Sequence, residues 1–275
     1  MQYPLAGKRA VVGGGSQGIG RAAAQALAEL GAEVLLLARN PQSLATAAAQ
    51  LPVPCGQNHR WLSVDNAQPE ALAAAVSAEV AAWGDVQILV NNTGGPAAGP
   101  VLDATPEAFL SAFTNHLLVN QRLVQVLVPG MKRAGYGRIV NVISTSVKAP
   151  LHGLGVSNTV RAAVGNWAKT LATELAPSGI TVNNVLPGAT ATERLTAIID
   201  GRAARTGRPY AEIEAEMKAE VPMGRFAAPA EIAAATAAAT SSAPEFGMRL
   251  YTSPVAGSRL SRKVPLAGAQ KAPSM

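Results

Sequence analysis

The sequence predicts an α/β protein with a doubly wound parallel sheet and helices on both faces. Short apolar runs alternate with longer, alanine-rich segments through most of the 275 residues. The runs have the length and composition of buried strands, and alanine is a strong helix former. Strands and helices in alternation build parallel sheets that are covered on both sides. A chain of this length is most simply one large domain, which we expect to span residues 1–245.

The first predicted strand leads through a glycine turn into the first predicted helix. Residues 8–12 form a short apolar run, three glycines follow it, and apolar residues then recur at helical spacing from Gly18 to Leu30. Gly31 ends the helix, and residues 31–37 form a second apolar run. Free N–H groups and the helix dipole at such a turn favour a pyrophosphate, and glycine lets the backbone approach it closely. The alternative is a turn that only packs strand against helix.

Further strands and a long helix are expected later in the chain. The strands are predicted at residues 61–64, 86–90 and 137–144, and the helix at residues 113–128. Residues 192–222 form a long stretch with apolar side chains on one face and glutamates on the other. The alternation of strands and helices therefore continues beyond the midpoint of the chain.

Five motifs, in order along the chain, resemble those of the short-chain dehydrogenase/reductase family. The glycine turn has the spacing Gly-x-x-x-Gly-x-Gly, with Gly13 where the family has threonine. The other four are an aspartate after the third strand, Asn-Asn-x-Gly after the fourth, a serine ending the fifth, and Pro-Gly with a following threonine after the sixth. The resemblance covers about residues 5–245 and extends to a divergent subgroup similar to 3-oxoacyl-acyl-carrier-protein reductases. It implies a Rossmann-type fold and hydride transfer between nicotinamide and a small carbonyl or alcohol substrate.

The resemblance also implies which residues bind the cofactor. The glycine turn would hold the pyrophosphate, Asp65 the adenine, and the loop after the sixth strand would close over the nicotinamide. The expected cofactor-binding residues are Gly14, Ser16, Gln17, Gly18, Ile19, Arg39, Asp65, Asn91, Thr93, Gly94, Pro187, Gly188 and Thr192. Residues 192–222 correspond to the family's substrate lid, and their length suggests a sizeable, partly apolar substrate.

The catalytic group departs from the family pattern. The family's tyrosine protonates the carbonyl oxygen, its lysine lowers the pKa of that tyrosine, its serine hydrogen-bonds the oxygen, and an asparagine supports a water relay. Here Ser144 is retained, whereas Ser157 and Arg161 stand at the tyrosine and lysine positions. His116 falls at the asparagine position. All four are candidate catalytic residues.

None of the three substitutions supplies an obvious proton donor. Serine does not titrate near neutrality, and arginine stays charged, although it could hold ribose hydroxyls. His116, with an ordinary pKa of about 6.5, is a candidate acid or a helix residue that satisfies its hydrogen bonds locally. Lys148 and His152 follow Ser144 on the side where substrate should enter, so either could protonate the substrate. The alternative, which we favour, is that each is an ordinary surface residue.

The end of the second strand indicates which nicotinamide cofactor is bound. An acid there would accept hydrogen bonds from the ribose and repel a 2′-phosphate. The chain has Ala38 at that place and Arg39 next to it. A guanidinium can hold a phosphate through two hydrogen bonds. We therefore expect NADP(H) to be favoured over NAD(H), the alternative being that Arg39 is only a solvated surface residue.

Composition excludes several classes of protein. The net charge is +6, but residues 245–275 carry +4 of it, so the body is nearly neutral and a poor nucleic-acid binder. The three histidines are scattered without metal-ligand spacing, and Cys55 is the single cysteine. No apolar run approaches the ~18 residues of a membrane helix. We expect a cytoplasmic protein with no membrane, nucleic-acid or metal partner.

The last part of the sequence does not follow the family pattern. Residues 246–275 carry several prolines and a basic excess where the family has a closing seventh strand, and we expect an atypical, poorly ordered tail there. A frame shift near Phe246 and a natural divergence both explain it. An exposed sheet edge invites association, and we expect a homo-oligomer, dimer or tetramer.

Two functions remain open at this point. The first is an NADPH-dependent oxidoreductase with an altered catalytic tetrad. The second is an NAD(P)-binding protein without turnover, acting as a sensor or a subunit. The reason for this hypothesis is that Ser157 and Arg161 replace the family's tyrosine and lysine. A third hypothesis, nucleic-acid binding, rests on the basic tail alone.

Overall fold

The computed structural model describes residues 3–241 of the chain. Within this part, six parallel strands form one sheet in the order β3-β2-β1-β4-β5-β6. The strands are β1 (Arg9–Gly13), β2 (Glu33–Ala38), β3 (Arg60–Ser63), β4 (Ile88–Asn91), β5 (Gly137–Val142) and β6 (Ile180–Val185). The strand order reverses between β1 and β4, so the predicted doubly wound, Rossmann-type fold is confirmed.

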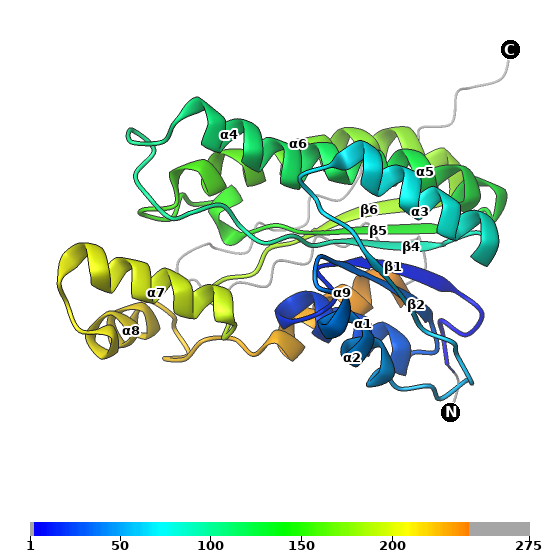
Figure 1. The fold of residues 1–275 in the computed structure, drawn as a ribbon, viewed down its shortest axis with the longest axis horizontal. Helices are drawn as coiled ribbons and strands as arrows, with labels where there is room; N and C mark the ends of the chain where they lie inside the picture. The colour runs from blue at the N-terminus through cyan, green and yellow to red at the C-terminus, as the bar shows by residue number, and fades with distance from the viewer. Residues whose placement is uncertain (1–2, 242–275) are drawn as a thin grey trace, which may run out of the picture.

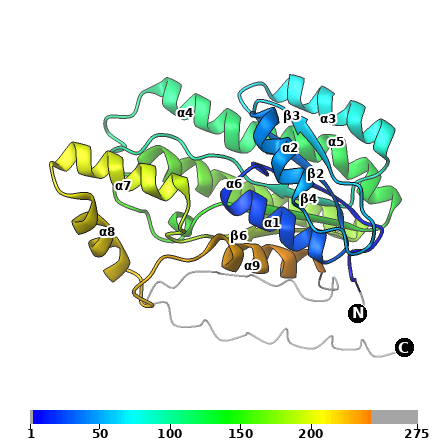
Figure 2. The same ribbon diagram turned by 60° about the horizontal axis from the view of Figure 1, so that its bottom comes forward.

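Helices cover both faces of the sheet (Figure 1). One face carries α1 (Gly18–Glu29), α2 (Pro41–Ala49) and α9 (Pro229–Ser241), with α9 packed against α1. The other carries α3 (Pro69–Trp83), α4 (Pro106–Phe113), the π-helical segment η1 (Thr114–Leu118), α5 (Val119–Arg133) and α6 (Gly155–Leu175). Short 3₁₀ turns, η2 (Thr145–Val147) and η3 (Ala176–Ser178), flank α6. Beyond one end of the sheet stand α7 (Glu193–Thr206) and α8 (Tyr210–Ala219), which make up most of the segment predicted as a lid (Figure 2).

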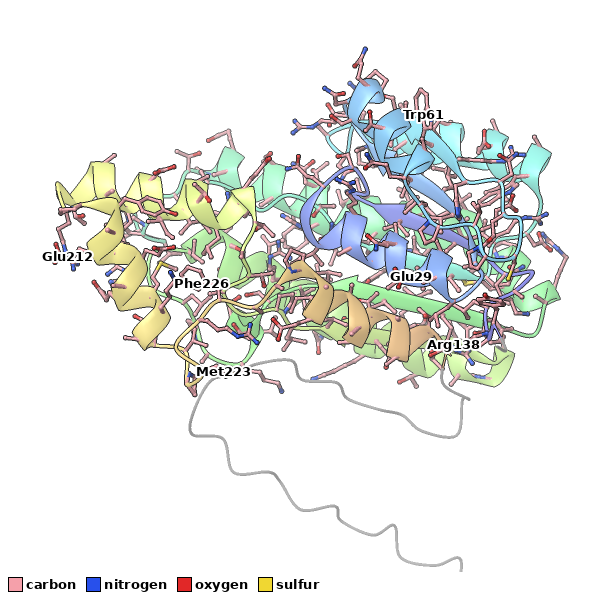
Figure 3. The ribbon with its side chains drawn as sticks, turned by 90° about the horizontal axis from the view of Figure 1, so that it is seen from below. Glu29, Trp61, Arg138, Glu212, Met223 and Phe226 are labelled. Carbon is pink, nitrogen blue, oxygen red and sulfur yellow. The ribbon has the colours of Figure 1, made fainter. Side chains whose placement is uncertain are left out.

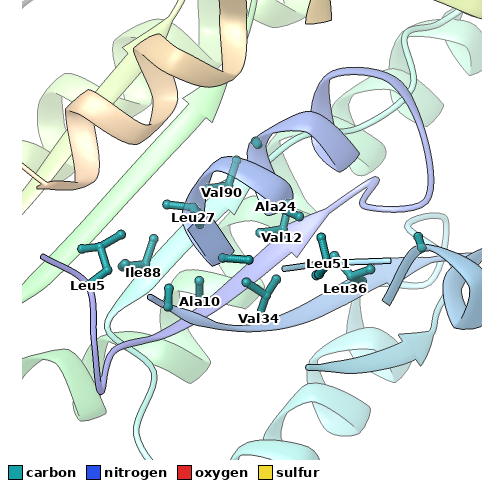
Figure 4. Packing of buried hydrophobic residues seen from close by; sticks show 14 of the residues in the cluster. Leu5, Ala10, Val12, Ala24, Leu27, Val34, Leu36, Leu51, Ile88 and Val90 are labelled. Carbon is teal, nitrogen blue, oxygen red and sulfur yellow. The ribbon is translucent and has the colours of Figure 1, made fainter. Parts of the chain in front are cut away.

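The core lies on both sides of the sheet because the central strands are apolar throughout. Leu27 of α1 packs with Val12, Leu36 and Val90 of the strands on one face (Figure 4). On the opposite face, a second cluster joins the strands to α3 and α5. Each fully buried leucine or valine contributes about 1.5–3 kcal/mol relative to an exposed position. This packing fixes the strand ends on which the site is built.

Two elements differ from their predicted extents. The strand expected at residues 137–144 ends at Val142, and Ser144 instead starts the turn η2. The helix expected at residues 113–128 begins as the π-helical segment η1 and continues as α5 to Arg133. A π-helical turn shifts the hydrogen-bond pattern and rotates the residues that follow, and such turns occur often at functional sites.

Two other expectations concern the termini and the membrane. The predicted tail at residues 246–275, and with it the question of a seventh strand, lies outside the described residues. Among the helices of residues 3–241, none combines the length and the hydropathy that a membrane crossing requires.

Candidate active site

The loops assigned to the cofactor meet at the carboxyl ends of the strands. Parallel strands all end on the same side of the sheet, and ligands bind there at the point where the strand order reverses. The glycine turn follows β1, residues 92–95 follow β4, and residues 186–192 follow β6. Thr192 lies close to the glycine turn, because a Cβ atom on Gly18 would be 3.5 Å from its Cγ2.

The glycine turn is shaped for close approach of a ligand. Gly14 and Gly18 have φ values of +60° and +56°, which side-chain-bearing residues rarely adopt. Gly20 packs so tightly that a Cβ atom there would be 2.2 Å from the Gly14 carbonyl oxygen. At the start of α1, the N-cap residue Gln17 makes no side-chain capping hydrogen bond within the described structure. The first N–H groups of α1 are therefore available to an anion.

The adenosine end of the site is open. Arg39 and Asp65 are both exposed, and they follow the neighbouring strands β2 and β3. A hydrogen bond of 2.8 Å from the Ser63 hydroxyl to the Arg39 carbonyl joins the two strand ends. No ion pair engages the Arg39 guanidinium among residues 3–241. This side chain can therefore meet a ligand phosphate without first breaking a salt bridge.

Ser144 begins the turn after β5. Its Oγ accepts a hydrogen bond of 3.1 Å from the Ser146 N–H, and the side chain is partly exposed. The Thr145 N–H donates to the Pro187 carbonyl at 3.1 Å, which ties this turn to the loop after β6. Because Ser144 Oγ is already an acceptor for the backbone, its own O–H remains to donate to a substrate.

Ser157 and Arg161 lie one helical turn apart on α6. Ser157 is buried, with 8% of its surface exposed. The Arg161 guanidinium donates to the carbonyls of Val142 and Ile143, both at 3.0 Å, and so sits at the carboxyl end of β5 beside Ser144. Burial, and then the charge of Arg194, lower the pKa of Arg161 to about 10. The guanidinium therefore remains charged at neutral pH.

His116 is buried in the π-helical segment η1. Its Nδ1 contacts the Thr93 hydroxyl at 2.5 Å, and 4% of its surface is exposed. Burial first, and then the charges of Arg161 and Arg194, lower the pKa of His116 to about 3. The imidazole is therefore neutral at physiological pH, which removes the imidazolium that a proton donor would need.

Arg194 is a site residue that the sequence did not single out. It occupies the first turn of α7, and its guanidinium donates to the Pro96 carbonyl in the loop after β4. A Cβ atom on Gly95 would be 3.0 Å from Arg194 Nη2, so the absent side chain makes room for the guanidinium. Burial lowers the pKa of Arg194. The only sequence signal for Arg194 was its place shortly after the Pro187-Gly188 loop, because its hydrogen-bond partner is 98 positions away.

An asparagine ladder crosses the sheet edge beneath the site. Asn91, Asn141 and Asn184 are register partners on β4, β5 and β6. Asn91 donates to Asn141 at 2.8 Å, and Asn141 donates to Asn184 at 3.0 Å. The Oδ1 atoms of Asn91 and Asn120 are buried and have no hydrogen-bond partner among the described residues.

Asn91 and Asn120 both line a small cavity. It also touches Thr93, His116 and Arg161, and its volume of about 10 Å³ is close to that of one water position. Asparagines with unpartnered oxygens and the side chain of Arg161 therefore border the same small space.

A second, larger cavity of about 330 Å³ is lined by residues of α7, of α8 and of the loops beside them, and we call it the lid cavity. Leu195 and Ile199, both buried, form its apolar wall. Phe226, which lies beside these helices (Figure 3), and Tyr210 add aromatic surface. Glu193 and Glu214 also line it. The assignment of residues 192–222 as a substrate lid stays a prediction.

The remaining candidates lie at the periphery. Lys148 and His152 are exposed in the loop between η2 and α6. Within residues 3–241, the structure shows no group of three histidine, cysteine or acidic side chains that could hold a metal ion.

The chain matches known proteins along most of its length. The model of the short chain dehydrogenase family matches residues 8–203. The chain is 33% identical to a 3-oxoacyl-(acyl-carrier-protein) reductase of Vibrio cholerae, over 85% of this chain and 89% of that protein. It is 34% identical to carbonyl reductase family member 4 of Danio rerio, over 82% of this chain and 88% of that protein.

The fold is also similar to that of solved structures. L-sorbose reductase of Gluconobacter frateurii, solved in complex with NADPH and L-sorbose, superimposes with a TM-score of 0.85. The two chains are 30% identical, and the match covers 94% of this chain and all of that one. An actinorhodin polyketide ketoreductase solved with NADPH gives a TM-score of 0.80 at 27% identity, over 92% of this chain and 98% of that one. With the matched family model and relatives above 30% identity, the chain belongs to the short-chain dehydrogenase/reductase family.

Proposed function

We propose that this protein is an NADPH-dependent oxidoreductase that transfers a hydride between nicotinamide and a carbonyl or alcohol. Its reacting oxygen is stabilised by Ser144 and by the charge of Arg161 in place of a titratable tyrosine. The observation that carries the proposal is the position of the Arg161 guanidinium, which binds the Val142 and Ile143 carbonyls next to Ser144.

The residues present fit a phosphorylated dinucleotide. The first turn of α1 has free N–H groups for the pyrophosphate, and Gly14, Gly18 and Gly20 leave no side chain in its way. The exposed Arg39 would hold the 2′-phosphate, with Asp65 at the adenine and Pro187, Gly188 and Thr192 at the nicotinamide. The neighbours solved with NADPH support this choice. When bound, NADPH supplies the hydride.

The chain's own residues would act on the substrate oxygen. As the hydride arrives, negative charge develops on that oxygen, and preorganised donors lower the barrier. Ser144 can donate its O–H, because its Oγ already accepts from the Ser146 N–H. Arg161 adds a fixed positive charge that does not depend on pH in the neutral range, since its pKa is about 10.

Proton delivery would differ from that of the family's tyrosine. His116 is neutral near pH 7 because its pKa is about 3, and the buried Ser157 hydroxyl does not titrate there. Their role is to hydrogen-bond, and solvent is the final proton source. Positioning alone supplies much of the rate of such reactions. We therefore propose a slow reductase whose rate is nearly constant from about pH 6 to about pH 9.

The test follows the hydride itself. The protein is supplied with NADPH deuterated on one or the other face of the nicotinamide, and a panel of ketones and aldehydes is screened by NADPH absorbance and mass spectrometry. Deuterium should appear in the alcohol from one face only. Ser144→Ala should lower kcat by about 100-fold, the usual effect of losing one oxyanion donor. Transfer without facial preference, or an unchanged Ser144→Ala variant, contradicts the proposal.

A second function is favoured by the same substitutions. With Ser157 and Arg161 on α6 and a neutral His116, no described residue around Ser144 is an obvious acid near pH 7. A cofactor-binding protein without turnover, acting as a sensor or a subunit, would need none. Tight NADPH binding, measured by fluorescence titration, without single-turnover oxidation by any carbonyl of the panel would favour this function.

We also propose that the protein is a homo-oligomer. Leu110, Phe113 and Leu118, on α4 and η1, are 68%, 36% and 46% exposed, and a group of large exposed apolar side chains is typical of an association surface. Light scattering after size-exclusion chromatography distinguishes a dimer or tetramer from a monomer. Leu110→Glu should shift the protein towards the monomer.

A further inference from the structure

Two arginines with no acidic partner among the described residues lie at the ends of neighbouring strands, Arg161 at the end of β5 and Arg194 at the loop after β4. Arg161 comes from α6 and Arg194 from α7, and the charge of Arg194 acts on Arg161 strongly enough to lower its pKa. Neither forms an ion pair within residues 3–241. Both are partly buried. Like charges this close are unfavourable, so the fold tolerates a repulsion that a bound anion would relieve.

Neutral contacts hold Arg194 in place. Its guanidinium donates to the Pro96 carbonyl and lies against Gly95, which has no side chain to exclude it. An arginine has five N–H donors, and only one contact of this guanidinium is with a described residue's hydrogen-bond acceptor. The remaining donors form a planar fork suited to a carboxylate or a phosphate.

We propose that Arg194 binds an oxyanion carried by the substrate, so that the substrate is an oxo-acid or a phosphorylated ketone, or the corresponding alcohol. This inference rests on the proposed oxidoreductase function and names its substrate class. The positive charge of Arg161, at the carboxyl end of β5, adds to the attraction. The oxyanion is a carboxylate or a phosphate, and the experiment below distinguishes them.

The position of Arg194 separates it from the residues assigned to the cofactor's phosphates. The pyrophosphate is assigned to the first turn of α1 and the 2′-phosphate to Arg39, whereas Arg194 contacts Gly95 and Pro96. These contacts lie beside Gly94, an expected cofactor contact, so a substrate held by Arg194 would be close to the cofactor. The lid cavity is a poor place for an anion, because Glu193 and Glu214 line it. The charged end of the substrate therefore belongs at Arg194 and the uncharged part beneath the lid.

The first experiment compares matched charged and neutral substrates. Acetoacetate is paired with its methyl ester, and dihydroxyacetone phosphate with dihydroxyacetone. The variant Arg194→Met is compared with Arg205→Met, which removes an exposed arginine from the last turn of the same helix. Arg194→Met should lower kcat/KM for the charged member of the preferred pair by about 10- to 100-fold, the usual effect of losing hydrogen bonds to a charged group. The neutral member and the Arg205→Met protein should change by less than about 3-fold.

Three outcomes would overturn the inference. An equal loss for both members of a pair would show that Arg194 positions the lid without binding charge. A wild type that prefers the neutral member of both pairs would show that no substrate anion is bound. A loss of NADPH affinity in Arg194→Met, with substrate selectivity unchanged, would assign Arg194 to the cofactor.

A binding measurement separates this inference from the proposed function. Acetoacetate and inorganic phosphate are titrated calorimetrically into the NADPH-loaded wild type, Arg194→Met and Arg205→Met proteins. Binding that is lost only in Arg194→Met supports the oxyanion site even if no carbonyl is reduced. If neither acetoacetate nor inorganic phosphate binds to the wild type, the oxyanion site is overturned, whether or not a neutral carbonyl is reduced.

Discussion

The glycine turn and the catalytic group lie at the same edge of the sheet but are built in different ways. The turn is made of backbone from one continuous segment, residues 13–20, and depends on the absence of side chains. The proposed catalytic group is made of side chains from separate segments, with Ser144 before η2, His116 in η1, and Ser157 and Arg161 on α6. A backbone site fails when a Cβ atom is added, whereas a side-chain site can change its chemistry while the fold is kept. On the proposed function, this chain would keep the family's turn and alter the family's catalytic group.

The largest expected effect tests the backbone half of this comparison. A methyl group at Gly20 would overlap the Gly14 carbonyl oxygen at 2.2 Å, so Gly20→Ala must distort the turn. We expect NADPH affinity, measured by fluorescence titration, to fall at least about 100-fold. Gly201→Ala, on α7 where no described atom lies within 4 Å, is the control and should bind NADPH normally. Retained affinity in Gly20→Ala would show that the turn does not hold the cofactor.

A charge reversal at Arg39 sharpens the comparison at the adenosine end. Arg39→Asp should lower the ratio of NADPH to NADH affinity by about 100-fold, because an acid repels the 2′-phosphate and accepts ribose hydroxyls. Lys169→Asp, the same charge change at an exposed position on α6, should leave the ratio unchanged. The ratio is obtained from the dissociation constants of NADPH and NADH for each variant. A constant ratio in Arg39→Asp would remove the phosphate assignment.

The buried imidazole provides a pH test of the side-chain half. The pKa of His116 is about 3 in the folded chain and about 6.5 when unfolded, so the unfolded state takes up the proton first as the pH falls. Its stabilising contribution is complete above about pH 6.5 and is lost progressively towards pH 3, amounting to about 2 kcal/mol lost by pH 5. His116→Asn should lose less free energy of unfolding between pH 7 and pH 5 than the wild type. Urea denaturation at both pH values measures this, and His152→Asn, at an exposed histidine, should behave as wild type.

The smallest expected effect is a gain of function. Ser157→Tyr with Arg161→Lys restores the family's pair at the spacing that α6 already provides. We expect kcat for a ketone that the wild type reduces to rise by about 10-fold, the lower end of general acid catalysis with some loss from packing at buried Ser157. Each single variant is made as a control, and thermal unfolding reports the folding of all three. A folded double variant without gain would show that the site is organised around another donor.

Local patterns explain why the fold and the glycine turn were predictable from the sequence. Each strand is a short apolar run, and the glycine turn is complete within eight residues, so no distant contact is needed to recognise it. Some element boundaries differ from the predicted ones by a residue or two. The end of β5 is an example, because the Ser144 side chain caps the turn η2, which the apolar pattern does not reveal.

The catalytic side was predictable only in part, because it depends on contacts between distant segments. The asparagine ladder joins positions 50 and 43 residues apart, and it forms only once strand register is set. Arg194 donates a hydrogen bond to the Pro96 carbonyl, and no residue spacing within α7 predicts that contact. The low pKa of His116 follows from burial by neighbouring elements together with two arginines, neither of which is near it in the sequence.

The asparagine ladder has a consequence for what the small cavity can hold. Asn91 donates to Asn141, and Asn141 donates to Asn184, so the side-chain N–H groups of Asn91 and Asn141 are used within the sheet. The Oδ1 atoms of Asn91 and Asn120 are buried and have no partner among the described residues, and both residues line the cavity. A buried acceptor without a partner is costly. The cavity therefore favours a molecule that brings hydrogens, such as water or an alcohol, over one that offers only lone pairs.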